Sequence, residues 1–132
     1  MDLSYSYCGS DIMPIPAEIS GQKYLSLTTF RKTGAPVRTP LWFAEANGKL
    51  YFMTRNDSWK YKRIRNNPNV LVAACTMRGT VTGPDLRAIA RVLPRGQWPA
   101  AQRLIRRKYW MARLPFWSSK NEYLEIEPAV DG

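Results

Sequence analysis

With 132 residues, 45% of them hydrophobic, the chain is long enough for one domain with its own core but too short for a dinucleotide-binding unit plus a substrate domain. The absence of histidine excludes Ser-His-Asp and Cys-His catalysis and the ordinary histidine-containing zinc sites, and two cysteines do not make a disulfide framework. The net charge of +10 indicates an anionic partner, either nucleic acid, an acidic membrane or a polyanionic small molecule, unless the basic surface serves only solubility.

The sequence predicts neither a transmembrane helix nor a signal peptide. No apolar run approaches the roughly 20 residues of a transmembrane helix, and MDLSYSYCGSDIMPIP lacks the charged start and apolar segment of a signal peptide. We therefore expect a cytoplasmic protein. Residues 1–20 are expected to form an N-terminal extension, residues 21–128 the folded domain and residues 129–132 a C-terminal tail.

The first half of the chain predicts strands joined by tight turns. KYLSLTTF (23–30) alternates between two faces, and the turn RKTGAP leads into a second strand, VRTPLWFAEA (37–46). An Asn-Gly turn then leads into KLYFMT. Pro40 cannot donate to a sheet ladder, so its strand should have an unpaired edge or a bulge there, which leaves backbone free to meet a ligand.

The second half predicts two helices and three more strands. A short helix should begin at Asp57 or Ser58 and end before Asn67-Pro68. WPAAQRLIRRKYWMARL (98–114) predicts an amphipathic helix, and strands are expected at 69–77, 86–94 and 121–128. Cys75 lies in the first of these strands, where a small buried thiol is its expected role. Six strands and two helices predict a mainly β fold, a small six-stranded antiparallel barrel.

Lys60 is unusual because it falls in the first turn of the short helix. Unpaired backbone N–H groups and the positive end of the helix dipole disfavour a cation there. A phosphate at this place would meet those N–H groups, the Ser58 hydroxyl, Lys60, and Thr54 or Arg55 from the end of the preceding strand. The alternative is that the four basic residues between positions 60 and 65 only solvate the helix.

The positive charge is concentrated in the second half of the chain. Between Ser58 and Asn121, fourteen Lys and Arg stand against one acid, Asp85, an excess of thirteen. The phosphate loops GxGxxG and GxxxxGK[ST] are absent, which argues against nucleotide-triphosphate hydrolysis. Aromatic residues among the basic ones could stack on nucleic-acid bases, but the strand aromatics alternate as core residues do, so nucleic acid is the weaker interpretation.

Four segments carry a resemblance to a known family by their order, namely KYLSLTTFRKTGAPVRTPLWFA, GKLYFMTRNDSWKYKRIRNNPNVLVAACTMRG, GPDLRAIARVL and EYLEIEP. Together they resemble the FMN-binding split-barrel family of pyridoxamine 5'-phosphate oxidase-like proteins, and most closely its branch that uses the deazaflavin coenzyme F-420. The similarity spans Gly21 to Pro128. Its most specific part is the phrase that contains Ser58, Lys60 and Asn67-Pro68.

The resemblance implies a homodimer that holds a flavin in the cleft between two barrels. Ser58 and Lys60 match the phosphate-binding residues of the family's helix start, and Thr54 matches a polar residue beside them. Three further residues match positions that are often basic in the deazaflavin branch, namely Arg55, Lys62 and Arg63. In the family, the backbone of one strand runs along the cofactor ring. The residues of this chain that match that strand are Thr39, Pro40, Leu41 and Trp42.

The activity implied is hydride transfer between reduced F-420 and a conjugated or quinone-like small molecule. The cationic excess suits a cofactor with several negative charges better than FMN with one phosphate. No catalytic side chain is identified, although Arg78 could stabilise charge on an acceptor oxygen, and no metal is expected. The alternatives are an FMN-dependent oxidoreductase on the same barrel and a non-enzymatic module that binds a cofactor or nucleic acid.

Two differences from the true pyridoxamine 5'-phosphate oxidases argue against pyridoxal phosphate synthesis as the activity of this chain. It lacks the extended C-terminal segment of the true oxidases and the histidine that helps to seat their substrate. The aromatic residues Trp110, Phe116 and Trp117 are expected to be core or dimer contacts rather than a wall of the substrate site.

Overall fold

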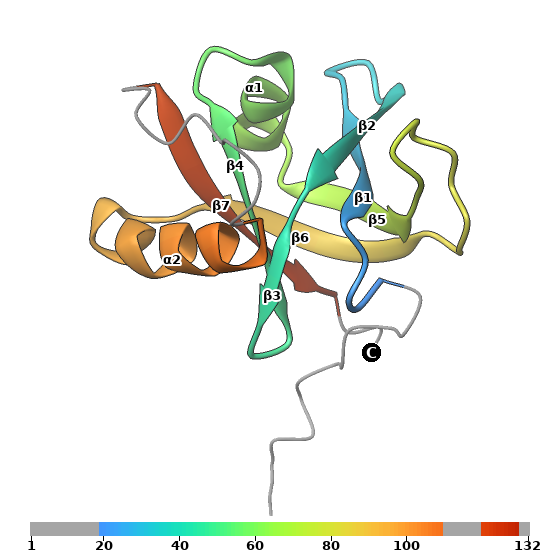
Figure 1. The fold of residues 1–132 in the computed structure, drawn as a ribbon. Coiled ribbons are helices and arrows are strands. Elements are labelled where there is room, and N and C mark those ends of the chain that lie inside the picture. Colours follow the sequence, from blue (N-terminus) through green and yellow to red (C-terminus); the bar gives the residue numbers. More distant parts are fainter. Residues whose placement is uncertain (1–18, 110–119, 130–132) are drawn as a thin grey trace, which may run out of the picture.

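The computed structural model describes residues 19–109 and 120–129, which form a curled antiparallel sheet with two helices (Figure 1). The helices are α1 (Trp59–Asn66) and α2 (Trp98–Lys108), the second preceded by a short 3-10 turn, η2 (Arg95–Gln97). The strands are β1 (Tyr24–Phe30), β2 (Pro36–Trp42), β3 (Ala44–Ala46), β4 (Lys49–Arg55), β5 (Asn69–Ala74), β6 (Leu86–Val92) and β7 (Asn121–Pro128).

The order of the strands shows how the sheet closes. It is β2-β1-β5-β6-β7-β4-β3, so the strands at its two ends are neighbours in the sequence, separated only by Phe43. The sheet therefore curls until one continuous segment joins its two edges. The predicted mainly β barrel is confirmed, with seven strands in the described residues instead of six, because the expected strand 37–46 changes partner at Phe43, from β1 to β4.

The change of partner at Phe43 is held by a tyrosine at the end of α2. Phe43 is fully buried, and its N–H donates to the Tyr109 hydroxyl oxygen at 3.0 Å. The same oxygen lies 2.8 Å from the Phe43 carbonyl and 2.7 Å from the Lys23 carbonyl, and its one proton serves one of them at a time. Tyr109 thus satisfies the backbone where the sheet ladder is interrupted, and burial raises its pKa to about 12.

The core consists of two clusters of apolar side chains. The larger fills the barrel and takes Tyr61 and Ile64 from α1, which packs against β1 and β6. The smaller lies beneath α2, where Ala101 and Ile105 meet Tyr123 of β7. Cys75 is a buried free thiol, as expected, and burial raises its pKa.

One acid of β7 is buried in the sheet rather than exposed to solvent. Glu125 is only 4% exposed. Arg91 Nε donates to one carboxylate oxygen at 2.9 Å, the Tyr51 hydroxyl donates to the other at 3.1 Å, and Lys49 Nζ lies 3.7 Å away. A buried carboxylate is tolerated here because both of its oxygens have partners.

The hairpin between β1 and β2 has its tip beside α1 (Figure 1). Gly34 has φ +91°, which glycine adopts without strain, and Arg31 N–H bonds the Ala35 carbonyl at 2.9 Å. The turn therefore presents Arg31, Lys32 and Thr33 together. Neither α1 nor α2 has the length and apolar character to cross a membrane, in the part of the chain that the structure describes.

Candidate functional site

Helix α1 begins where β4 ends, and two hydroxyl groups meet there. Of the two expected N-caps, Asp57 and Ser58, the structure selects Ser58, whose Oγ accepts from the Tyr61 N–H at 3.2 Å. Ser58 Oγ also lies 3.1 Å from Thr54 Oγ1. The helix ends at Asn67, whose backbone is extended because Pro68 follows. The predicted neighbours Thr54 and Ser58 are thus together at the helix start.

Lys60 lies half-buried in the first turn of α1, which contains no acidic residue. Burial lowers its pKa, and the positive charge of Arg63 lowers it further. Within residues 19–109 and 120–129, its ammonium has no hydrogen-bond acceptor or carboxylate partner, and the N–H groups of Trp59 and Lys60 have no acceptor. A partly desolvated cation beside unpaired N–H groups is an arrangement that an oxyanion would stabilise.

Arg55 is paired within its own turn. Its Nε and Nη2 donate to the two oxygens of Asp57 at 3.0 and 2.9 Å, and Lys120 Nζ lies 3.3 Å from the same carboxylate. The hydrogen bond from Arg55, followed by that from Lys120, holds the pKa of Asp57 well below its usual range. Arg55 would have to leave this exposed ion pair to bind a cofactor, so its role as a ligand stays a prediction.

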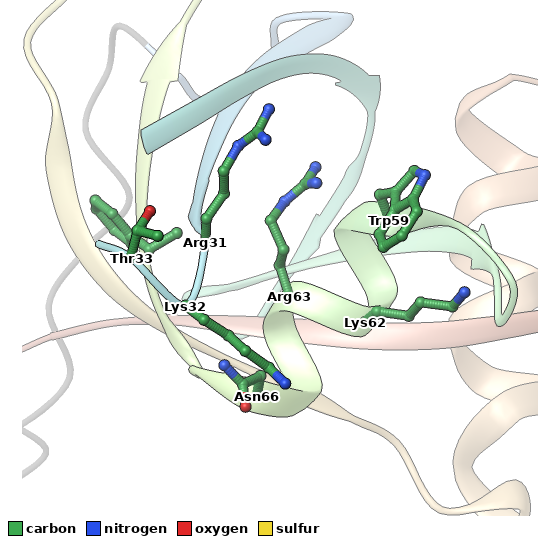
Figure 2. A pocket seen from close by; sticks show the side chains of 8 residues that line it. Arg31, Lys32, Thr33, Trp59, Lys62, Arg63 and Asn66 are labelled. Carbon is green, nitrogen blue, oxygen red and sulfur yellow. The ribbon is translucent and has the colours of Figure 1, made fainter. Parts of the chain in front are cut away.

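A pocket of about 560 Å³ lies between α1 and the tip of the β1–β2 hairpin (Figure 2). Arg31 and Lys32 line it from the hairpin, and Lys62 and Arg63 line it from α1. Lys62 Nζ lies 4.8 Å from the centre of the Trp59 ring, which is 71% exposed. The described lining contains no acid, and its other members are Phe30, Thr33 and Asn66.

The two arginines of this pocket are close enough to affect each other. Figure 2 shows their side chains extending in the same direction from the hairpin and from α1. Burial lowers the pKa of Arg63, and the charge of Arg31 lowers it further. Arg63 Nε donates to the buried Thr29 Oγ1 at 2.7 Å, which fixes the guanidinium and leaves its two Nη groups toward the pocket.

The strand predicted to run along a cofactor ring is β2, at one end of the sheet. This position agrees with the unpaired edge expected from Pro40. Thr39 and Trp42 are half-buried, Leu41 is buried, and Pro40 is exposed. The Trp42 ring stacks on Tyr109 with ring centres 4.8 Å apart, so one face of its indole is already covered.

The predicted site residues therefore fall into separate groups. Thr54 and Ser58 meet at the start of α1, Lys60 lies in its first turn, and Lys62 and Arg63 line the pocket. Four residues lie on the edge strand, namely Thr39, Pro40, Leu41 and Trp42. Arg78 lies exposed after β5. Arg31 and Lys32 were not among the predicted site residues, although two adjacent cations before the turn glycine in RKTGAP indicate a cationic hairpin tip. Trp110, Phe116 and Trp117 lie outside the described residues.

A curled antiparallel sheet whose edges are joined by one segment, together with two helices, is the architecture of the split-barrel class of proteins. The family model described as pyridoxamine 5'-phosphate oxidase matches residues 15–129. The chain therefore belongs to this family, and the resemblance seen in the sequence is confirmed.

Solved structures share the fold at low sequence identity. A putative pyridoxamine 5'-phosphate oxidase from Listeria innocua is 16% identical over 85% of this chain and 88% of its own, with a TM-score of 0.66. An F-420 reductase is 20% identical over 88% and 97%, with a TM-score of 0.65. A heme binding protein from Mycobacterium smegmatis is 12% identical over 86% and 52%, with a TM-score of 0.63. No curated protein sequence matches significantly.

Proposed function

We propose that the protein binds the phosphate of a flavin-type cofactor at the start of α1 and transfers a hydride between coenzyme F-420 and a conjugated or quinone-like small molecule. The observation that supports this most is the first turn of α1. There the half-buried Lys60, two unpaired backbone N–H groups and the Ser58 hydroxyl lie together without an anionic partner in the described residues.

The residues at the helix start fit a phosphate group. Lys60 supplies the charge, the N–H groups of the first turn donate hydrogen bonds, and the hydroxyl of the Thr54–Ser58 pair whose proton is not used within the pair can donate to a phosphate oxygen. The bound cofactor supplies the hydride chemistry, whereas the protein supplies binding and orientation. The edge strand β2 is the element whose backbone we propose to run along the cofactor ring, in a cleft completed by a second copy of the chain.

The choice of F-420 over FMN rests on charge. The excess of thirteen cations between positions 58 and 121 exceeds what one phosphate requires. A structure named F-420 reductase is among the similar folds, which is compatible with this choice. The alternatives are FMN on the same barrel and a module that binds a cofactor or nucleic acid without catalysis.

The proposal is tested by titrating purified protein with F-420 and with FMN, followed by fluorescence. We expect tighter binding of F-420, and the combined Ser58→Ala and Lys60→Ala variant should weaken binding of the preferred cofactor roughly 100-fold. The matched control is Lys23→Ala, which removes an exposed cation that precedes β1 and lies outside α1. This variant should leave the affinity unchanged. Reduced F-420 should lose its electrons to a quinone only in the presence of protein that binds it.

Three results would change the assignment. If yellow FMN co-purifies with the protein in a stoichiometric amount, the cofactor is FMN and not F-420. If the parent binds neither cofactor, the enzymatic function is refuted. If the parent binds no flavin and the double variant lowers its oligonucleotide affinity by the same roughly 100-fold, the site is one for nucleic acid.

A further inference from the structure

The pocket between α1 and the β1–β2 hairpin is not the phosphate site at the helix start. Successive helical residues turn by about 100°, so Trp59, Lys62, Arg63 and Asn66 share one side of α1. All of them line the pocket, and Lys60 does not. The helix side that carries Tyr61 and Ile64 is buried against the barrel. The pocket therefore lies on the opposite side of α1, and its other wall is the hairpin tip.

Four cationic side chains from two separate elements line this pocket, and its described lining contains no acidic residue to neutralise their charge. Within residues 19–109 and 120–129, no carboxylate pairs with Arg31, Lys32, Lys62 or Arg63. Other arginines of the protein do have such partners, as Arg38 does with Asp85 at 2.8 Å. Like charges held together raise the energy of the folded state, and a bound anion would lower it.

Arg63 is positioned for a ligand and is not free to turn away. Its Nε is used by the buried Thr29 Oγ1 at 2.7 Å, so the planar guanidinium is fixed with its Nη groups available. Arg31 extends beside it from the hairpin (Figure 2). A pair of guanidinium groups presents parallel donors that match the oxygens of a carboxylate or a phosphate.

We propose that this pocket is a second anion site, which binds a ligand with at least two negatively charged carboxylate or phosphate groups. One such group would lie between Arg31 and Arg63, and the lysines Lys32 and Lys62 would neutralise the other. The volume of about 560 Å³ is that of a small-molecule site. Phe30 and Trp59 give the pocket apolar walls for the carbon skeleton of the ligand.

The charged groups can come from two sources. They can belong to a free polyanion, or they can be the anionic arm of a cofactor whose phosphate is held at Ser58 and Lys60. The pocket does not depend on the proposed oxidoreductase function, because inorganic pyrophosphate and citrate probe it without any flavin.

The test is calorimetric titration of the full chain with pyrophosphate, citrate, F-420 and FMN at constant ionic strength. The variants are Arg31→Gln, which removes an exposed side chain, and Arg63→Gln. The matched control is Arg103→Gln, because Arg103 is exposed on α2, which packs on β3, β4 and β7. For whichever of these ligands binds to the parent, we expect each pocket variant to lower the affinity roughly tenfold or more.

Two outcomes support the site and identify the source. Binding of pyrophosphate or citrate that depends on Arg31 and Arg63 but not on Arg103 indicates a free polyanion. The second outcome is that neither pyrophosphate nor citrate binds, while the pocket variants lower the affinity for F-420 and leave the affinity for FMN unchanged. This result indicates that the pocket binds the anionic arm of the cofactor.

Two other outcomes overturn the site. One is an equal loss in all three arginine variants, and the other is no dependence of any ligand on Arg31 or Arg63. Failure of the proposed function is distinguishable from both. In that case the parent binds neither F-420 nor FMN, whereas binding of pyrophosphate or citrate that depends on Arg31 and Arg63 persists.

Discussion

At the scale of single residues, Lys60 shows that an empty anion site lowers the stability of the folded protein. A half-buried ammonium without a partner in the described residues costs free energy of folding, and the lowered pKa of Lys60 reflects that cost. We expect Lys60→Met to stabilise the unliganded protein by roughly 0.5–2 kcal/mol and to weaken phosphate-bearing cofactors at the same time. Thermal denaturation with and without cofactor measures both effects, and Lys23→Met is the control.

The pH dependence of this gain has a definite sign. Because the pKa of Lys60 is lowered by folding, the unfolded chain binds the proton more tightly, and the cost is fully present at neutral pH. The advantage of Lys60→Met should therefore shrink as the pH rises toward the ordinary lysine value of about 10.4. A destabilised variant at neutral pH would show that Lys60 is held by contacts of its own.

At the scale of elements, the joint between β2 and β3 depends on one hydroxyl group. Tyr109→Phe would leave the Phe43 N–H and carbonyl buried without a partner, and we expect a loss of about 1–3 kcal/mol. Urea denaturation measures it. The control is Tyr24→Phe, because Tyr24 is half-buried and its hydroxyl has no hydrogen-bond partner in the described residues. Equal losses in both variants would refute the role given to the Tyr109 hydroxyl.

The same tyrosine contributes to alkaline instability. Its folded pKa of about 12 lies above the ordinary tyrosine value near 10, so the folded state binds the proton more tightly and stability falls as the pH rises between these values. The Tyr109→Phe variant should therefore lose less stability than the parent over this range.

The elements differ in how far the sequence predicts them. The bounds of α1 follow from Ser58 and from Asn67-Pro68, because capping and the residue before proline are local effects. The change of strand at Phe43 could not be predicted, because the alternation runs through it and only a partner 66 residues away reveals it.

The two parts of the candidate site differ in the same way. Thr54 and Ser58 are four residues apart, so a local motif brings them together. Arg31 and Arg63 meet only because the hairpin tip lies beside α1, and nothing in the spacing of two distant basic residues indicates this. Glu125 is a similar case, since its burial depends on Arg91 and Tyr51 from other strands.

At the scale of the whole molecule, the net charge of +10 predicts how binding responds to salt. Screening weakens attraction between a cationic surface and an anion, more strongly for a ligand with more charges. We expect the affinity for F-420 to fall more steeply with salt than the affinity for FMN. Titrations across a range of sodium chloride concentrations measure the two slopes, and equal slopes would mean that only the phosphate of F-420 contacts the cations.

The position of Phe43 between the two edge strands also bears on how the chain folds. β1 with β2, and β3 with β4, are hairpins of neighbouring residues, and they share a single linking residue. Bringing the two rims of the sheet together therefore requires almost no loop closure at that point, so little chain entropy is lost there. We expect the long-range pairings of β4 and β6 with β7 to be the slower part of folding, because they join segments that are far apart in the sequence.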